Sequence, residues 1–318
     1  MARHDLKQLS FAEGLIKQRA GRNEWFEEIA RVLDWAALER VLAPIYASEE
    51  GRPSYPLLTL LKIVLLQQWY GLSDPGMEEA LDDRLSFRRF CGLPLDEGVP
   101  DHTTIWRFRQ ELARHGLAEA AFAEVNRQLA ARGLFIKRGT LIDATVVPAA
   151  VKPPAGETGT VSAGDPQAGW TKKGGKSVYG YKGHVGVDEG SGLVHSAELT
   201  GADLHDSQRF AGLVRAGDQA VYADKAYASA AHRAWLAERG IKDGVMHRAA
   251  SGKPLKPWQT SFNKAVSPIR AAVERVFALL KRRYGWRRAR YLGLARNACH
   301  FQLLLTAMNI RRALALAA

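Results

Sequence analysis

The chain has 318 residues, 47% of them hydrophobic, and a formal net charge of +12. A chain of this length can form two domains with substantial cores. A positive excess of this size indicates a polyanionic partner, most simply nucleic acid, and makes a merely solubilising charge less satisfactory as an explanation.

The sequence lacks the features of secreted, membrane-spanning, zinc-binding and disulfide-bonded proteins. The opening residues, MARHDLKQLS, have no apolar core of a signal peptide, and no apolar run approaches the ~20 residues that span a bilayer. Cys91 and Cys299 are far apart and have no neighbouring ligand pairs, which argues against a zinc site or a disulfide framework. We therefore expect a cytoplasmic protein that neither enters nor crosses a membrane.

Residues 1 to about 135 are predicted to be helical. Apolar residues recur at helical spacing over 23–46, and a more hydrophobic helix begins near Pro56. After a turn at 71–75, a further helix is predicted over 77–93. A Gly- and Pro-rich loop then leads to Asp101, which is a good N-cap for a helix that begins at residue 102.

The last two of these helices, with the loop between them, resemble a helix-turn-helix that presents its N-terminal end to DNA. The second helix carries Thr103, Thr104, Arg107 and Arg109. On this hypothesis Arg107 and Arg109 contact DNA. Ordinary helix packing is the alternative, because helix pairs are common in proteins of every function.

From about residue 138 the pattern changes to short β-runs. The predicted order is three strands, helix, strand, helix, strand, helix, which is the order of an RNase H-like α/β domain. In that topology the first and fourth strands are neighbours, so Asp143 in the first and Asp224 at the end of the fourth converge. The predicted segments are 139–149, 179–189, 192–201, 205–216, 219–227, 229–240, 242–249 and a helix from 267.

Both aspartates are unusual residues for their positions. Asp143 lies within an apolar run, where a carboxylate costs several kcal/mol unless it is paired, protonated or metal-bound. Asp224 also follows an apolar strand. Either acid alone is explained equally well by hydrogen bonds from backbone N–H groups. With Glu274 they offer the oxygen ligands that Mg²⁺ or Mn²⁺ prefers, and two such ions support in-line phosphoryl transfer.

The segment 267–286 is predicted to be a helix that begins at Ser267 as N-cap, with a proline in its first turn. Arg270, Glu274 and Lys281 lie within roughly 40° of one another around this helix. The alternative is a solvated helix edge with an ion pair. One apolar stripe is predicted to pack on the core, and it consists of Ile269, Ala272, Val273, Val276 and Leu280.

Two basic segments are further candidates for DNA contact. Residues 151–177 are rich in Gly and Pro, and we expect a mobile loop that orders on DNA through Lys172 and Lys173, or one that is simply disordered. The run 281–291 alternates cations with aromatics, which is typical of phosphate contact and base stacking. From this run we single out Arg282, Arg283 and Trp286, with burial as the alternative for the tryptophan.

Four polar residues lie close in sequence to the strands of the predicted site: Lys182, His184, Asp188 and Lys225. They are either near the site or ordinary alternating residues of half-exposed strands. The dipeptide His205-Asp206 opens a predicted helix, so a capping role is favoured over a metal pair.

The chain resembles the DDE transposases of bacterial insertion sequences, and specifically the insertion sequence five family within the insertion sequence four group. The resemblance covers nearly the whole chain. In the N-terminal part it is carried by RPSYPLLTLLKIVLLQQWYGLSDPGMEEAL and PDHTTIWRFRQEL. In the C-terminal part it is carried by GTLIDATVV, YKGHVGVDEGSGLVH, ADKAY and RAAVERVFALLKRRYGWRRARYLGL.

The resemblance implies that Asp143, Asp224 and Glu274 are the catalytic, metal-binding DDE triad. Arg270, Glu274 and Lys281 match the R, E and K of the group's Y-R-E-K signature, whereas Ser267 occupies the tyrosine position. Arg270 and Lys281 are then expected to hold DNA phosphates.

The resemblance further implies a bacterial, nucleoid-associated transposase with two Mg²⁺ or Mn²⁺ ions per active site. It would bind transposon-end DNA and target DNA as a homodimer, cut strands to free 3′-OH ends and join them to the target. We expect a helical DNA-binding domain over 1–135 and an RNase H-like catalytic domain over 136–318. Two alternatives remain open: a DNA-binding protein with an unused catalytic fold, and a metal-dependent nuclease.

Overall fold

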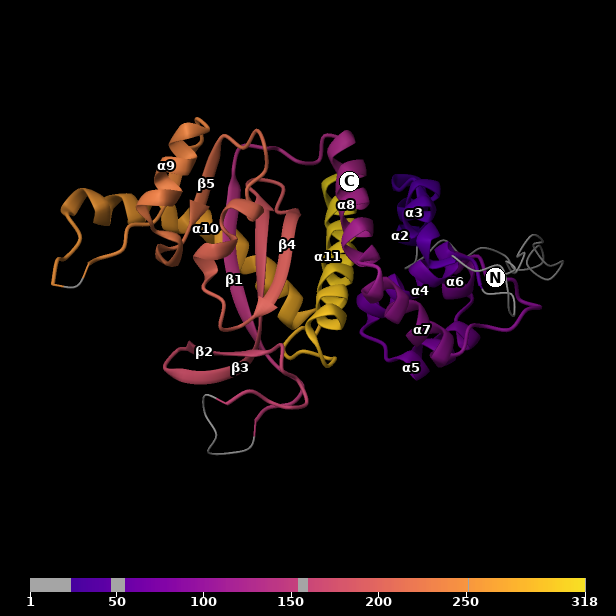
Figure 1. Cartoon of the computed structure of the whole chain (residues 1–318). Helices are drawn as coiled ribbons and strands as arrows, with labels where there is room; N and C mark the ends of the chain where they lie inside the picture. The colour runs from indigo at the N-terminus through magenta and orange to yellow at the C-terminus, as the bar shows by residue number, and fades with distance from the viewer. Residues whose placement is uncertain (1–23, 47–54, 154–159, 251, 318) are drawn as a thin grey trace. The chain divides into compact units, whose positions relative to one another are not determined.

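The computed structural model describes residues 24–46, 55–153, 160–250 and 252–317 (Figure 1). The chain divides into two compact units, Met1–Arg132 with Gln302–Ala318, and Gly133–Phe301. The C-terminal helix α11 (Leu294–Ala317) contributes its first turns to the second unit and the rest to the first. No helix in the described ranges combines the length and the apolar character that a membrane span requires.

The first unit is helical, as predicted. Asp34, Ser73 and Asp101 each cap a helix by accepting a hydrogen bond from the backbone N–H three residues later. Gly71 ends α4 with a left-handed backbone (φ 68°), which glycine adopts without strain. Apart from α11, the elements are α2 (Glu24–Val32), α3 (Trp35–Leu42), η1 (Ala43–Tyr46), α4 (Leu57–Tyr70), α5 (Asp74–Asp83), α6 (Leu85–Cys91), α7 (His102–Arg114) and α8 (Leu117–Ala131).

The single helix predicted over 77–93 is in fact two helices, α5 and α6. Arg84 between them has an extended backbone (φ −110°, ψ 101°). The buried side chain of Arg88 stabilises this break, because its Nε donates to the Leu81 carbonyl near the end of α5 at 3.1 Å. The periodicity of the sequence alone did not reveal this long-side-chain cap.

The second unit is built on a mixed sheet in the order β2-β3-β1-β5-β6, with β4 paired to β3 (Figure 1). β1 runs antiparallel to β3 and parallel to β5. This is an RNase H-like α/β arrangement, and the predicted adjacency of the first and fourth predicted strands, β1 and β5, is confirmed. The strands are β1 (Thr140–Pro148), β2 (Gly169–Lys173), β3 (Lys176–Asp188), β4 (Val194–Gly201), β5 (Ala220–Ala223) and β6 (Lys242–Val245).

Part of the segment predicted as a loop over 151–177 is ordered as a β-ribbon. β3 has 13 residues and extends beyond β1, so its free length pairs with β2. Trp170 on β2 packs against Tyr179 on β3, with ring centroids 5.3 Å apart. The Gly- and Lys-rich composition of this segment did not predict β2, because the apolar contact that stabilises β2 comes from its partner β3. Residues 154–159 of the predicted loop lie outside the described residues.

The helix predicted over 205–216 is replaced by two short 3₁₀ helices, η2 (Asp206–Arg209) and η3 (Ala211–Leu213). A third, η4 (Lys225–Tyr227), follows β5, and α9 (Ala230–Glu238) connects it to β6. Together with β1, β5 and β6, these segments enclose one hydrophobic cluster of the second unit.

The long helix α10 (Pro257–Arg282) begins ten residues before the predicted start at Ser267. Pro257 lies in its first turn, and the Gln259 side chain accepts a hydrogen bond from the Lys256 N–H at 2.9 Å. Pro268 therefore lies inside the helix. The buried residues of α10 are Val266, Val273, Val276, Phe277 and Leu280, whereas Ile269 and Ala272 of the predicted stripe are half-buried.

Candidate active site

Asp143 and Asp224 are brought together by the parallel pairing of β1 and β5. Leu141 pairs with Tyr222, and Ile142 with Ala223. One residue further along each strand, Asp143 and Asp224 occupy matching positions. Since side chains alternate between the faces of a sheet, both carboxylates lie on the face of Leu141 and Tyr222. The charge of Asp224 contributes to a raised pKa of Asp143, which agrees with their proximity.

Asp143 is a half-buried carboxylate with two hydrogen bonds. Its Oδ1 accepts from the Ala144 N–H at 2.8 Å, and its Oδ2 accepts from Arg270 Nη2 at 3.2 Å. Burial raises the pKa of Asp143 to about 6, and the Arg270 charge opposes this rise. The Arg270 charge therefore offsets only part of the cost of burying this carboxylate.

Asp224 is held by the turn that follows its strand. Its Oδ1 accepts a hydrogen bond from the Ala226 N–H at 2.8 Å, so it caps η4. This contact fixes one carboxylate oxygen at the end of β5, next to Asp143.

Helix α10 packs against β1 through the edge that carries Arg270, Glu274 and Lys281. Arg270 contacts Asp143, and Lys281 Nζ donates to Thr145 Oγ1 at 2.5 Å. Asp143 and Thr145 lie on one face of β1 because they are two residues apart. Glu274 lies one turn beyond Arg270 on the same edge. Its side chain is exposed and makes no hydrogen bond or ion pair with the described residues.

The donor set fits a divalent cation in part. Asp143 and Asp224 supply adjacent carboxylate oxygens. Burial, and to a lesser extent the charges of Asp224 and Asp206, raise the pKa of Asp143, and a bound cation would offset both effects. Within the described ranges, however, no three His, Cys, Asp or Glu residues are grouped closely enough to hold a metal ion. The third predicted ligand, Glu274, must therefore approach the aspartates for a complete site to form.

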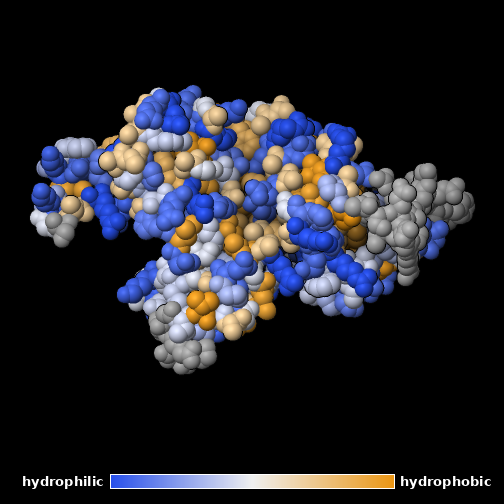
Figure 2. Space-filling view, viewed as in Figure 1, coloured by the Kyte–Doolittle hydropathy of each residue, from blue (hydrophilic) through white to orange (hydrophobic). Residues whose placement is uncertain are grey.

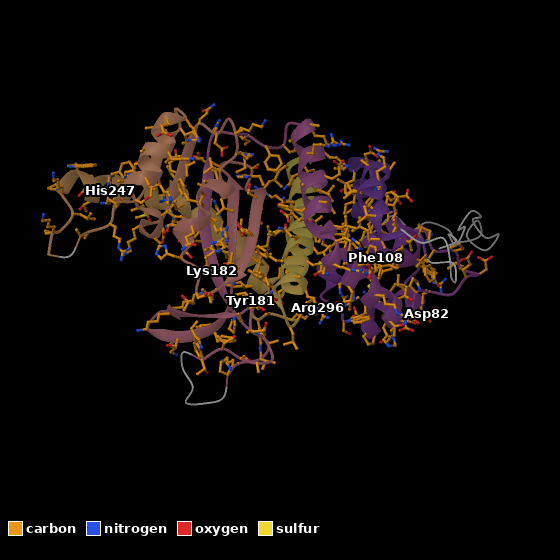
Figure 3. The ribbon with its side chains drawn as sticks, viewed as in Figure 1. Asp82, Phe108, Tyr181, Lys182, His247 and Arg296 are labelled. Carbon is orange, nitrogen blue, oxygen red and sulfur yellow. The ribbon has the colours of Figure 1, made fainter. Side chains whose placement is uncertain are left out.

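Lys182 reaches this region through Asp206, an acid that the sequence predicts only as a helix cap. Lys182 is labelled in Figure 3. Its Nζ lies 2.8 Å from Asp206 Oδ1 and donates to the Leu204 carbonyl at 2.6 Å. The charge of Asp206 also raises the pKa of Asp143. The expected capping role of Asp206 is wrong, because the cap of η2 is His205, whose side chain accepts from the Ser207 N–H. In the sequence, the one indication that Asp206 lies near Asp143 was its position as an acid at the start of a predicted helix.

His184 is a buried residue of β3. Its Nε2 lies 3.0 Å from Thr200 Oγ1, and burial lowers its pKa to about 4, so the imidazole is neutral at pH 7. The charge of Asp206 opposes this shift. His184 therefore lies near Asp206, although it contacts neither Asp143 nor Asp224 within the described structure.

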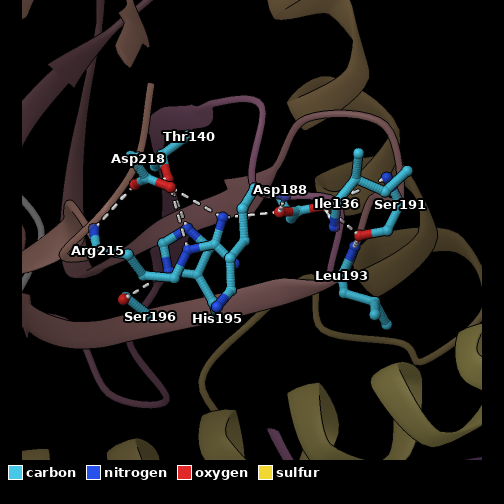
Figure 4. Close-up of polar contacts among 10 residues, drawn as sticks. Ile136, Thr140, Asp188, Ser191, Leu193, His195, Ser196, Arg215 and Asp218 are labelled. Atoms are coloured by element: carbon cyan, nitrogen blue, oxygen red, sulfur yellow. Dashed lines mark hydrogen bonds and ion pairs between the residues drawn. The ribbon is translucent and has the colours of Figure 1, made fainter. Parts of the chain in front are cut away.

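Asp188 is a structural residue, which corrects its assignment to the surroundings of the site (Figure 4). It is fully buried and accepts hydrogen bonds from the backbone N–H groups of Ile136 and Lys137 at 3.0 and 2.9 Å. Arg215 Nη2 pairs with it at 2.7 Å. These bonds hold the chain that enters β1 against the end of β3. Lys225, by contrast, is exposed beside Asp224.

Two residues predicted to contact DNA are buried. Arg109 donates to Gln67 Oε1 at 3.0 Å and forms a two-pronged ion pair with Asp74, so it is a structural residue of the helical unit. Trp286 is 2% exposed and stacks on Phe301 with centroids 4.5 Å apart. Since neither side chain is accessible, the assignment of both to DNA contact is wrong.

The other predicted DNA contacts are accessible. Arg107, Lys172, Lys173, Arg282 and Arg283 are exposed. The tip of the β2–β3 ribbon, where the two lysines lie, is hydrophilic in the space-filling view (Figure 2).

Lys281 and Lys173 form a close pair of cations. Burial, and then the neighbouring charge of Lys173, lower the pKa of Lys281 to about 8. An anion bound between the two ammonium groups would relieve their repulsion. The pair is therefore suited to phosphate.

Comparison with known proteins agrees with this geometry. Residues 135–310, more than half of the chain, match the family described as Transposase DDE domain. Residues 15–111 match the family described as Transposase domain (DUF772). No solved structure matches the chain. The chain belongs to the DDE transposases, which are metal-dependent enzymes that cut DNA.

Proposed function

We propose that this enzyme is the transposase of a bacterial insertion sequence, and that it belongs to the insertion sequence five family within the insertion sequence four group. It binds the ends of its element, cleaves strands to free 3′-OH ends and joins those ends to target DNA. The observation that carries this proposal is the apposition of Asp143, within β1, and Asp224, which directly follows the parallel strand β5, beneath the cationic edge of α10.

Asp143, Asp224 and Glu274 are the residues that would hold Mg²⁺ or Mn²⁺, with two ions per active site. Bound divalent ions supply activation of the attacking oxygen and stabilisation of the leaving oxygen in phosphoryl transfer. Asp143 and Asp224 present adjacent oxygens, and Glu274 completes the set when the segment of α10 that carries it moves toward them.

Arg270 and Lys281 position the phosphates. Arg270 contacts Asp143 with Nη2, and its guanidinium, whose side chain is 12% exposed, would lie beside a phosphate bound at that aspartate. Lys281 and Lys173 provide a second cationic point. Because Arg270 and Lys281 lie on either side of Glu274 along α10, they would orient the DNA strand across the three carboxylates.

Recognition of the terminal DNA is assigned to the helical domain, residues 1–135, and catalysis to residues 136–318. The exposed Arg107 on α7 is suited to this contact. Arg282, Arg283 and the lysines of the β2–β3 ribbon would add sequence-independent phosphate contacts. Synapsis of two transposon ends requires two copies of the chain, so we propose a homodimer on DNA.

The reaction partner distinguishes this function from the alternatives. The protein is incubated with terminal DNA and Mg²⁺ or Mn²⁺, and then with terminal DNA that has a pre-cut 3′-OH and a plasmid target. Strand-transfer products support the transposase. Cutting without joining in both assays would identify a nuclease, and binding without cutting would identify a DNA-binding protein with an unused catalytic fold.

A further inference from the structure

An open pocket of about 510 Å³ lies where the parallel strands β5 and β6 end. It is lined by residues 228–230 after η4, by Arg233 of α9 and by residues 247–250 after β6. In open α/β sheets, ligands bind beyond the carboxyl ends of the parallel strands. None of these described lining residues is acidic, so the pocket is suited to an anion.

The pocket begins close to Asp224. Ala228 follows this aspartate by four residues, so their Cα atoms are at most about 14 Å apart. A DNA strand rises about 3.4 Å per phosphate along the helix axis, so this distance corresponds to about four phosphates. A strand that crosses Asp143 and Asp224 can therefore reach the pocket within a few nucleotides.

His247, labelled in Figure 3, connects α9 and α10 at the pocket. Its Nδ1 lies 3.3 Å from Arg233 Nη2 and 3.5 Å from Gln259 Nε2. Both neighbours are donors, so Nδ1 is the acceptor and the ring proton is on Nε2. Burial, and then the Arg233 charge, lower the pKa of His247, so the imidazole is neutral at pH 7. Its second nitrogen is therefore a hydrogen-bond donor.

The two arginines of the pocket differ in the contacts that they already make. Arg233 forms an ion pair with Asp243 and donates to the Val245 carbonyl at 3.0 Å, so its charge is compensated within the protein. Arg248 is exposed and makes no hydrogen bond or ion pair with residues in the described ranges. An anion in the pocket would supply the counter-charge that Arg248 lacks there.

The chain around the pocket is basic over a longer stretch. Between Asp243 and Glu274 the sequence has five Lys and Arg residues and no acid. Trp258 in this stretch is 56% exposed, and exposed aromatics among cations are typical of surfaces that bind nucleic-acid strands. A surface of one sign favours an extended polyanion over a small ligand. Its exposed lysines are Lys253, Lys256 and Lys264.

We propose that this pocket binds a backbone phosphate of the DNA strand that crosses Asp143 and Asp224, and that Arg248 makes the contact. The inference rests on the proposed function and adds a point that holds the strand within a few nucleotides of the cut. A small phosphate compound has the same chemistry, but a pocket that opens to solvent beside the catalytic acids suits a continuous strand.

Arg248→Ala tests the contact. The melting temperature should stay unchanged, because the side chain is exposed and makes no contact in the described part of the chain. Affinity for terminal DNA at about 0.1 M salt should fall by about 5- to 10-fold, and the slope of log affinity against log salt by about 0.9. Lys242→Ala, at the opposite end of β6, is the matched control and should bind as the wild type does. Wild-type affinity and slope in Arg248→Ala would overturn the proposal.

Terminal DNA with a single methylphosphonate, which removes the charge of one phosphate, locates the contact. The change is placed in turn at each of about four phosphates on either side of the cleavage position. At one of them it should weaken binding by the wild type and have little further effect on Arg248→Ala, because both changes remove the same contact. Additive losses at every position would overturn the proposal.

The same experiments separate this inference from the proposed function. Cleavage and strand transfer by the wild type, without coupling between Arg248 and any phosphate, would remove the pocket contact and leave the transposase intact. A wild type that does not bind terminal DNA would remove both. Calorimetric titration with millimolar inorganic phosphate should show no saturable binding. Saturable binding that Arg248→Ala abolishes would assign the pocket to a small phosphate compound and overturn the assignment to DNA.

Discussion

Nη2 of Arg270 lies 3.2 Å from Oδ2 of Asp143, so helix α10 places a positive charge directly on the aspartate of β1. Both side chains are mostly buried, with 12% and 20% of their surface exposed. Removing one partner of such a pair leaves a charge that neither water nor protein compensates well.

Arg270→Ala should therefore destabilise the metal-free protein by about 2 kcal/mol, less than for a fully buried pair. A bound divalent ion would replace the lost charge, so Mg²⁺ should raise the melting temperature of this variant more than that of the wild type. Thermal unfolding with and without Mg²⁺ measures both effects. Arg275→Ala, at an exposed position of the same helix, is the control and should match the wild type. Equal Mg²⁺ effects in all three proteins would contradict the account.

Lys173 and Lys281 are expected to share a phosphate. Replacing either by Ala should weaken DNA binding and lower the slope of log affinity against log salt by about 0.9 for one lost contact. The double variant should lose little more than the single ones, because both cations serve one site. Fluorescence anisotropy over a salt series measures this. Lys242→Ala, exposed on β6, should leave the slope unchanged; a slope unaffected by Lys281→Ala would exclude the shared site.

Arg107 and Arg109 are neighbours on α7 with opposite expected roles. Arg109→Ala removes the positive charge that faces Asp74 in a largely buried pair, to which Gln67 Nε2 also donates at 2.7 Å, and should cost about 3 kcal/mol of stability. Arg107→Ala should change stability little and weaken binding to terminal DNA. Chemical unfolding and DNA titration of both variants separate the two effects. An Arg109→Ala protein of wild-type stability would show that the ion pair does not stabilise the helical unit.

His195 makes the stability of the catalytic domain depend on pH. Its Nε2 lies 2.8 Å from Thr140 Oγ1 and its Nδ1 2.8 Å from Ser196 Oγ (Figure 4). Burial lowers the pKa of His195 to about 3, and the Arg215 charge acts in the same direction. Below about pH 6.5 the unfolded chain takes up a proton on His195, whereas the folded chain does not. The contribution of the neutral imidazole to the free energy of unfolding is therefore fully present above that pH and is lost as the pH falls toward 3.

From this residue we expect a loss of about 2 kcal/mol between pH 7.5 and 5. Urea unfolding across this range measures it. His195→Gln should show a shallower dependence, whereas His205→Gln, at an exposed position, should keep the wild-type profile. A profile unchanged in His195→Gln would show that the imidazole does not control this pH response.

The features that could be predicted from the sequence were those with a local physical signature. An aspartate within an apolar strand marked Asp143, and the order of strands and helices placed Asp224 beside it. The shared edge of Arg270 and Lys281 followed from helix geometry alone, although the start of α10 was missed because Ser267-Pro268 imitates the start signal that Pro257 supplies.

What could not be predicted depends on partners distant in the chain. Arg109 is buried because Asp74 and Gln67 face it, 35 and 42 residues away. β2 forms because β3 extends beyond the end of β1 and its free residues pair with 169–173. No pattern within 169–173 indicates this pairing. Tyr227 and Asp206 come together through contacts between 3₁₀ helices, elements too short to have a periodicity.

The central claim is that Asp143, Asp224 and Glu274 form one catalytic centre, and strand cleavage by three near-isosteric variants tests it most directly. Asp143→Asn, Asp224→Asn and Glu274→Gln are compared with Glu238→Gln, an exposed acid on α9, on terminal DNA with Mg²⁺. Cleavage should fall to background in the three variants and persist in the control, while all four bind the DNA. Wild-type cleavage by Asp143→Asn or Asp224→Asn would contradict the aspartate centre, and wild-type cleavage by Glu274→Gln would remove Glu274 from it.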